Sequence, residues 1–250
     1  MSALAERPLE TPTFLDDLTP DSGLALRRWT TDEFRRITAN GILGAGERLE
    51  LLGGEILAGD GRTPRLFDRD EYYGLAEHGI LGPEERTELI HGRIIQCMSP
   101  MGRPHCVAVI KTASALSAAF GSGFFAEQQM PLQLSSGLEP QPDVMVLPGT
   151  PDDYEDEPGP EDILLLVEVS DTTLRYDRGT KARMYAAEGI PDHWIVHLRK
   201  RTLEVRRQPE NGEYLSLDVY DETESVAPLA APNFPVSVAS LLPLVRSRVE

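Results

Sequence analysis

The feature that most constrains the fold is a short aliphatic run, ILLLVEVS, at residues 163–170. A run of this length without alternating polar residues is typical of a strand that is buried on both faces. Glu168 lies near the end of this run, where an ionised carboxylate is costly unless another group pairs with it or coordinates it. Glu168 therefore marks the exit of the strand into solvent, forms a structural ion pair, or belongs to a functional site.

The sequence on both sides of this run predicts a mixed sheet flanked by helices. The apolar spacing of residues 105–120 indicates an amphipathic helix, and strands are expected at 124–134 and 142–147. After the run, residues 180–190 predict a helix that ends at Gly189, followed by the strands HWIVHL, TLEVRRQ and YLSLDVY. This order of elements favours an α+β (α/β-like) fold with a mixed central β-sheet.

The N-terminal third contains an internal repeat. WTTDEFRRITANGILGAGERLELLGGEI (29–56) aligns with FDRDEYYGLAEHGILGPEERTELIHGRI (67–94) at an offset of 38 residues. Each copy predicts a short helix ended by glycine, a turn, and a strand that reverses at a glycine. Two copies are too few for a solenoid. We therefore expect an irregular lead-in (1–25), an N-terminal appendage (26–62) with the first copy, and a main domain (63–250) whose central sheet the second copy joins.

The composition restricts partners and compartment. The net charge of −17 means that the surface as a whole repels nucleic acid, although basic residues gather in 174–183 and 198–207. Seven acidic residues in 151–162 predict a solvated loop. The chain has no apolar run of transmembrane length, its N-terminus lacks a basic region followed by an apolar one, and its two cysteines suit a reduced compartment. We therefore expect a cytoplasmic protein without a membrane partner.

Four charged residues form the candidate catalytic site: Glu88, Asp143, Glu168 and Lys181. Hydrolysis of a phosphodiester needs a metal that polarises the phosphate and lowers the pKa of the attacking water. Mg²⁺ (or Mn²⁺) prefers hard oxygen ligands, typically one or two carboxylates. Asp143 and Glu168 supply such ligands if their strands are neighbours. A nearby lysine can orient the water or offset charge that develops on the phosphate.

These residues stand in a pattern that resembles the Uma-type restriction endonucleases of the PD-(D/E)XK nuclease superfamily. The resemblance covers roughly residue 67 to the end. It rests on the set taken together rather than on one motif. The matching positions are Pro142-Asp143, Glu168-Val169-Ser170, Asp177, Lys181, Tyr185, Gly189-Ile190-Pro191 and Trp194-Ile195-Val196.

The resemblance implies a restriction-endonuclease-like core, in-line attack that leaves a 5′-phosphate, and DNA as the substrate. It places Glu88 at the glutamate of the family's first motif, and it gives possible supporting roles to His105, Gln129, Asp177 and Tyr185. The chain departs from the superfamily at Ser170, where a lysine is usual, so the lysine has moved to the helix as Lys181.

Each residue also has a structural interpretation. Asp143 can cap a turn, Lys181 can be a solvated helix lysine, and Glu88 can pair with Arg86 or Arg93 across a hairpin. His105 can be a core or capping histidine, Tyr185 can pack beside Lys181, and Asp177 can hold the start of a helix. The order of all four charged residues favours the functional interpretation.

The sequence therefore predicts a metal-dependent phosphodiesterase, namely a DNA endonuclease, in which Asp143 and Glu168 hold Mg²⁺ and Lys181 positions water. The alternative is a catalytically inactive nuclease-like interaction module. A homodimer is compatible with either hypothesis. We further expect Glu88 to lie beside Asp143, and Glu50, its equivalent in the first copy, to lie away from the site.

Overall fold

The computed structural model describes residues 13–44, 46–98, 102–135 and 137–244, so residues 1–12 of the expected lead-in lie outside the described part. Its largest sheet has the order β12-β11-β10-β9-β8-β6, in which only β9 and β10 are parallel. The fold is mixed α and β with a central mixed sheet, as predicted. The strands of this sheet are β6 (Phe124–Gln128), β8 (Val144–Pro148), β9 (Leu165–Ser170), β10 (Asp192–His197), β11 (Thr202–Glu210) and β12 (Glu213–Asp221).

Helices cover both faces of the central sheet, so every residue of β9 is buried. Val167 and Val169 face α3 (Arg103–Phe120) and α6 (Val238–Leu241) in one apolar cluster. Leu166 faces α5 (Ala182–Ala187) in another, on the opposite face. Side chains alternate along a strand, so Glu168 points to the same face as Leu166. The strand thus delivers a carboxylate beneath the helix that follows it.

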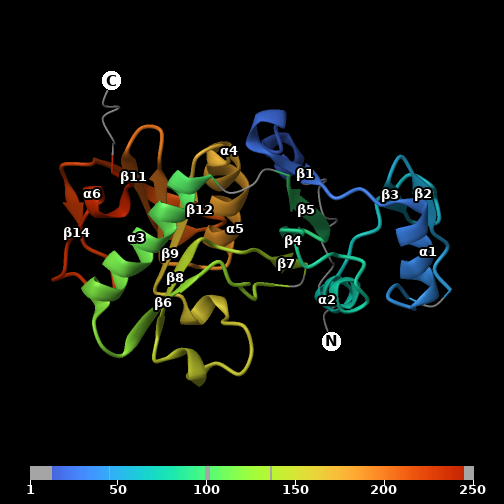
Figure 1. Cartoon of the computed structure of the whole chain (residues 1–250), viewed down its shortest axis with the longest axis horizontal. Helices are drawn as coiled ribbons and strands as arrows, with labels where there is room; N and C mark the ends of the chain where they lie inside the picture. Colours follow the sequence, from blue (N-terminus) through green and yellow to red (C-terminus); the bar gives the residue numbers. More distant parts are fainter. Residues whose placement is uncertain (1–12, 45, 99–101, 136, 245–250) are drawn as a thin grey trace.

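A second sheet, β1-β5-β4-β7, lies beside the first (Figure 1). The hairpin of the second repeat copy does not join the central sheet, which corrects the sequence-based expectation. Its strand β4 pairs instead with the short β7, and β7 precedes β8 in the chain, so this segment links the two sheets. The lead-in is also not irregular throughout, because β1 pairs with β5. The strands are β1 (Leu24–Leu26), β4 (Thr87–Ile90), β5 (Arg93–Cys97) and β7 (Leu138–Glu139).

Each copy of the repeat folds as predicted, with a helix followed by a hairpin. The first copy forms α1 (Thr31–Ala39) and the pair β2 (Glu50–Leu52) and β3 (Glu55–Leu57), and the second forms α2 (Arg69–Glu77), β4 and β5. Both helices begin with a capping box. The two copies share one apolar cluster, in which the equivalent aromatic rings of Trp29 and Phe67 lie 5.6 Å apart. The boundary between residues 62 and 63 therefore falls inside a common core.

The two copies also exchange backbone partners. The Arg27 N–H donates to the Ile94 carbonyl in the second copy, at 2.8 Å. At the equivalent positions, the Arg65 N–H donates to the Ile56 carbonyl in the first copy, at 2.9 Å. The segment that precedes each copy thus pairs with the hairpin of the other copy, as strand β1 before the first copy and as an isolated bridge between Pro64 and Leu57 before the second. This exchange gives the repeat an approximate twofold symmetry.

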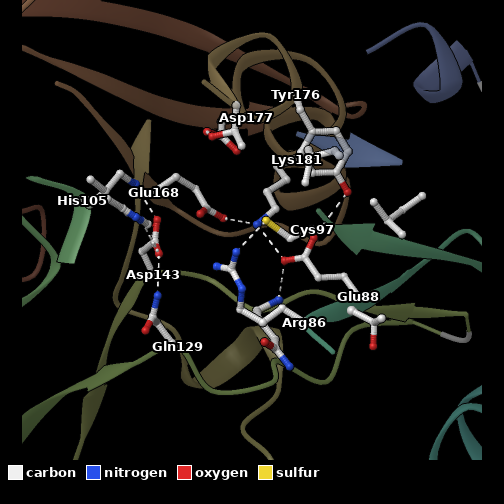
Figure 2. A pocket seen from close by; sticks show the side chains of 16 residues that line it. Arg86, Glu88, Cys97, His105, Gln129, Asp143, Glu168, Tyr176, Asp177 and Lys181 are labelled. Atoms are coloured by element: carbon white, nitrogen blue, oxygen red, sulfur yellow. Dashed lines mark hydrogen bonds and ion pairs between the residues drawn. The ribbon is translucent and has the colours of Figure 1, made fainter. Parts of the chain in front are cut away.

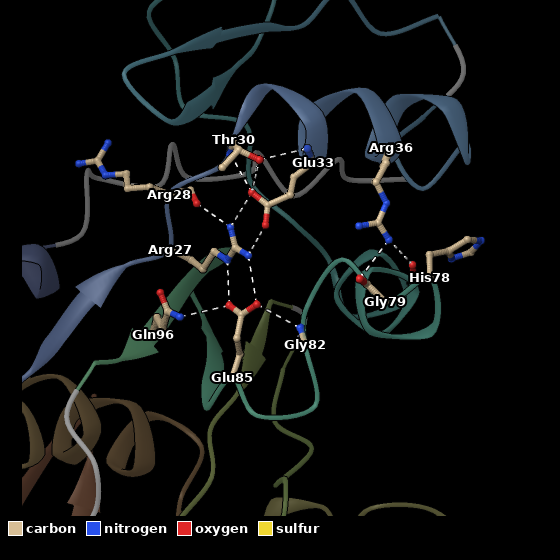
Figure 3. A network of polar contacts seen from close by, with 10 residues as sticks. All are labelled: Arg27, Arg28, Thr30, Glu33, Arg36, His78, Gly79, Gly82, Glu85 and Gln96. Atoms are coloured by element: carbon tan, nitrogen blue, oxygen red, sulfur yellow. Dashed lines mark hydrogen bonds and ion pairs between the residues drawn. The ribbon is translucent and has the colours of Figure 1, made fainter.

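The arginine side chains repeat the exchange, and Figure 3 shows the contacts of Arg27. Arg27 lies between Glu33, which belongs to its own copy, and Glu85, which belongs to the other copy. Its guanidinium Nη2 is 2.5 Å from Glu33 Oε1, and its Nε is 3.1 Å from Glu85 Oε2. Arg65 occupies the equivalent position, and it contacts Glu71 of its own copy and Glu47 of the other.

Candidate active site

The pairing of β8 with β9 places Asp143 opposite Glu168. Val144 pairs with Val167 in this antiparallel ladder, and one further step in the register brings Asp143 opposite Glu168. Residues in this relation point to the same face of a sheet. The Asp143 carboxylate also accepts a hydrogen bond of 2.8 Å from the backbone N–H of Val169, which fixes it at the end of β9.

Lys181 joins this pair from the helical segment above the sheet. Its ammonium Nζ is 3.0 Å from Glu168 Oε1 and 2.9 Å from Glu88 Oε1. Figure 2 shows the two glutamates facing the ammonium from opposite sides. Glu88 arrives from β4 of the second sheet, so the site lies where the two sheets meet. Glu50, the equivalent residue in the first copy, is exposed on β2 and pairs within its own hairpin.

The chain turns from β9 back towards Glu168 through an irregular helix. A short α4 (Leu174–Tyr176) leads into a π-helical segment (Asp177–Lys181) and then into α5. Asp177 anchors the turn, because its Oδ2 accepts hydrogen bonds from the hydroxyls of Ser170 and Thr173. Ser170, which stands where the resemblance leads us to expect a lysine, thus holds the segment that carries Lys181. Single π turns inside helices occur frequently at functional sites.

Further side chains surround the charged residues. His105 Nε2 lies 3.1 Å from Asp143 Oδ1, close enough for an ion pair but poorly aligned for a hydrogen bond. Gln129 donates from Nε2 to the same oxygen at 3.3 Å. The Tyr185 hydroxyl donates to Glu168 Oε1 at 2.7 Å. The four possible supporting residues, which include Asp177, therefore all lie at the site or one contact from it.

Burial governs the electrostatics of this cluster. It raises the pKa of Glu168 well above the usual value, and Lys181 opposes that shift. Burial also raises the pKa of Asp143, against the opposing influence of His105. Burial alone would lower the pKa of Lys181, but Glu168 and Glu88 together raise it well above its ordinary value. Ionisation of all three carboxylates would create more negative charge than Lys181 offsets, so a bound cation would favour that ionised state.

A pocket of about 300 Å³ gives access to these groups, and Glu88, Asp143, Glu168 and Lys181 all line it. No three His, Cys, Asp or Glu side chains converge to enclose an ion anywhere in the part of the chain that the structure describes. Magnesium does not need such an enclosure, because it keeps several waters and takes only one or two protein carboxylates. Asp143 and Glu168, paired on adjacent strands at the pocket, fit that requirement.

Other lining residues were not identified from the sequence. Arg86 donates from Nη2 to the Cys97 sulfur at 2.9 Å inside the pocket. The Gln141 backbone N–H donates to Glu88 Oε1 at 2.9 Å, and the Tyr176 hydroxyl lies 3.4 Å from Glu88 Oε2. Gln141 and Tyr176 stand directly before motif residues, at 142 and 177, and this adjacency is the one signal that could have pointed to them.

Comparison with known proteins agrees with this geometry. Residues 69–239 match the model of the Uma2 family, whose description is "Putative restriction endonuclease". This match spans more than half of the chain. The chain belongs to the Uma2 family. The match excludes the first repeat copy, which is therefore an addition to the Uma2 region.

The solved structures include a similar fold. A crystal structure described as a "putative nuclease belonging to DUF820" from Anabaena variabilis superposes with a TM-score of 0.52. The two sequences are 18% identical, and the alignment covers 69% of this chain and 95% of that one. At this identity the likeness shows the fold.

No curated protein matches the sequence. No helix in the described ranges is long and apolar enough to cross a membrane. The description of the family indicates a nuclease, and the solved structure shows a shared fold.

Proposed function

We propose that this Uma2 protein is a metal-dependent DNA endonuclease. One observation carries the proposal: Asp143 and Glu168 lie opposite each other on adjacent strands, and the Lys181 ammonium is 3.0 Å from Glu168 in the same pocket. An ion pair with a purely structural role would not need a second buried carboxylate beside it. A buried carboxylate pair is costly, and a divalent cation offsets that cost.

Each residue then has a separate role. Asp143 and Glu168 hold the magnesium or manganese ion. When bound, this ion polarises the phosphate and lowers the pKa of the attacking water. Lys181 has three N–H donors on Nζ, which it uses to orient that water and to offset negative charge on the phosphate. Glu88 accepts from Lys181 and braces its position.

The supporting residues fix the carboxylates. Val169 N–H and Gln129 Nε2 bind the two oxygens of Asp143, so its carboxylate cannot rotate freely. Tyr185 donates to Glu168 and directs one of its oxygens towards Lys181. Positioned groups of this kind lower the barrier because they need little reorganisation during the reaction.

The test is cleavage of supercoiled, linear and single-stranded DNA by the full chain, with Mg²⁺ or Mn²⁺ and with chelator. Asp143→Asn and Glu168→Gln preserve side-chain size, and each is expected to lower cleavage by about two orders of magnitude or more. Glu88→Gln is expected to lower it as well. Glu50→Gln is the matched control, because it makes the same change at the equivalent exposed position and should leave cleavage unchanged.

Calorimetry with Mn²⁺ distinguishes the enzyme from an inactive nuclease-like module. A metal site that Asp143→Asn abolishes, together with metal-dependent cleavage, supports the proposal. Wild-type cleavage rates in both Asp143→Asn and Glu168→Gln would rule out the assigned site. Absence of any metal binding at millimolar concentration would favour the inactive module.

A further inference from the structure

A segment that precedes the Uma2 region contacts the irregular helix of the active site. Residues Thr13–Asp17 form a 3-10 turn that lies beside α4 and the π-helical segment (Figure 1). Phe14 of this turn is 2% exposed, and it belongs to the same apolar cluster as Met184 and Tyr185 of α5. Because the family match begins at residue 69, a part of the chain outside that match supports the active-site helix.

Asp17 makes the polar contacts between this turn and the helix. Its carboxylate is almost fully buried, and it reaches all three pieces of the helix. Oδ1 is 3.2 Å from Arg175 Nε in α4. Oδ2 accepts a hydrogen bond of 2.7 Å from the Thr180 hydroxyl in the π-helical segment, and it lies 3.4 Å from Arg183 Nη2 in α5. One carboxylate thus ties together the segments whose geometry sets the direction of Lys181.

Gly179 allows the Asp17 carboxylate to come this close to the helix. A Cβ added to Gly179 would lie 3.0 Å from the Asp17 Cγ, and closer still to one of the carboxylate oxygens. A larger residue would therefore push the carboxylate away and break its hydrogen bond with Thr180. The contact thus depends on a matched aspartate and glycine from two distant parts of the sequence.

The contact matters because Thr180 directly precedes Lys181 at the end of the π-helical segment. The Lys181 ammonium must keep its contacts with glutamates that come from two different sheets. Displacement of a catalytic group by about 1 Å can lower a rate by up to about two orders of magnitude. We propose that Asp17 is a positioning residue, which fixes the end of the π-helical segment and so holds Lys181 beside Glu168. The role of Lys181 in cleavage belongs to the proposed function, on which this inference rests, whereas its position can be measured separately.

Amine labelling of the full chain measures the position of Lys181 without any cleavage. Lys181 is 5% exposed, whereas Lys200 is exposed and provides an internal reference. Acetic anhydride, followed by mass spectrometry, should modify Lys181 about tenfold faster in Asp17→Ala than in the wild type, relative to Lys200. Asp16→Ala is the matched control, because Asp16 is the exposed neighbour in the same turn and its loss should leave the labelling rate unchanged.

Cleavage of supercoiled DNA tests whether Asp17 acts through Lys181. Asp17→Ala should lower kcat about 10- to 100-fold and leave KM and Mn²⁺ affinity unchanged, since Asp143 and Glu168 keep their places. In a chain that already carries Lys181→Met, Asp17→Ala should cause no further loss of kcat. A general loss of stability would instead lower metal affinity as well, and it would lower the rate in both backgrounds.

Two further variants separate the hydrogen bond from the charge. Asp17→Asn can still accept from Thr180 and should recover most of the lost kcat, because Arg175 and Arg183 are largely exposed and their ion pairs are weak. Gly179→Ala should lower the urea midpoint of the wild type but not that of Asp17→Ala, where the added Cβ has room and alanine favours the helix. If Asp17→Ala does not fold by circular dichroism, Thr180→Val removes the same hydrogen bond and keeps the shape of the side chain.

Unchanged labelling of Lys181 in Asp17→Ala would overturn the inference. A further loss of kcat when Asp17→Ala is added to Lys181→Met would also overturn it, because the two residues would then act independently. A wild-type chain that cleaves no DNA with either metal would refute the proposed function instead, and the labelling rates would still decide whether Asp17 positions Lys181.

Discussion

Asp177 offers the sharpest test of the electrostatics at this site. Its carboxylate is 3% exposed, and burial raises its pKa from 3.8 to about 6, although Lys181 and the hydroxyls of Ser170 and Thr173 oppose the shift. A raised pKa means that the folded protein holds this proton more tightly than the unfolded chain does. Stability should therefore fall as pH rises from about 4 to about 6, and it should stay lower above that range.

The magnitude follows from the shift. A difference of about two pKa units corresponds to about 3 kcal/mol of unfolding free energy. Asp177→Asn removes the ionisation and can keep both hydrogen bonds, because Ser170 and Thr173 donate to the same oxygen, Oδ2. The variant should therefore be more stable than the wild type by up to about 3 kcal/mol at pH 8, and equally stable at pH 4.

Urea unfolding at pH 4, 6 and 8 measures this difference. The comparison of variant with wild type measures Asp177 together with its coupling to the neighbouring carboxylates, because the Asp177 charge helps to raise the pKa of Glu168 and is absent from the variant. Asp60→Asn is the control of opposite sign, since the exposed Asp60 has a pKa lowered to about 2 by hydrogen bonds from Thr63 and should lose stability at neutral pH. If Asp177→Asn is less stable than the wild type at pH 8, the buried charge is fully compensated and the reasoning is wrong.

Three further predictions follow from the structure. Lys181→Met should spare metal binding by calorimetry but lose cleavage rate, and urea titration at pH 8 should show a loss of about 3–5 kcal/mol that shrinks at lower pH as Glu168 takes up a proton. Gly92→Ala should lower the unfolding free energy in urea by about 1–3 kcal/mol, because its φ is +71° and an added Cβ would lie 2.7 Å from the Leu66 Cβ. Gly41→Ala, with φ +68° and open space, should cost about 1 kcal/mol in the same urea titration. Arg27→Gln and Arg65→Gln should lower the unfolding free energy in urea by similar amounts, about 2–4 kcal/mol each. Unequal losses would show that the two arginines do not contribute equally to stability despite their equivalent positions.

The sequence predicted the central sheet and much of the site because these depend on local patterns. The continuous apolar run identified β9. Because successive side chains of a strand point to opposite faces, the position of Glu168 in the run set the face on which it lies. The expected placement of Lys181 near Glu168 is also met, since a strand followed by a helix returns the chain to the same sheet. The remote position of Glu50 agrees with the structure too. The catalytic roles of these residues stay proposals.

Other features could not be predicted because they depend on a choice between equivalent partners. Either hairpin of the repeat offers the same edge to the strand before it, and no local signal says that β1 pairs with the second copy. The separate sheet of β4 depends on the two-residue β7, which is too short to leave a pattern. The π-helical segment has no sequence signature of its own, and it arises where Asp177 binds Ser170 and Thr173.

The exchange of backbone and arginine contacts between the repeat copies has a consequence for how this chain can evolve. Tandem repeats are commonly lost by recombination between their copies, which here would delete 38 residues and leave a single module. That module would keep one arginine and one of the two glutamates that each arginine now bridges, and its half of the common core would be uncovered. The lost partners would be available only from the module of another molecule. The reciprocal contacts thus make the duplication difficult to reverse. A chain with one module would need a second chain to provide the glutamate and the apolar surface that the other copy provides here.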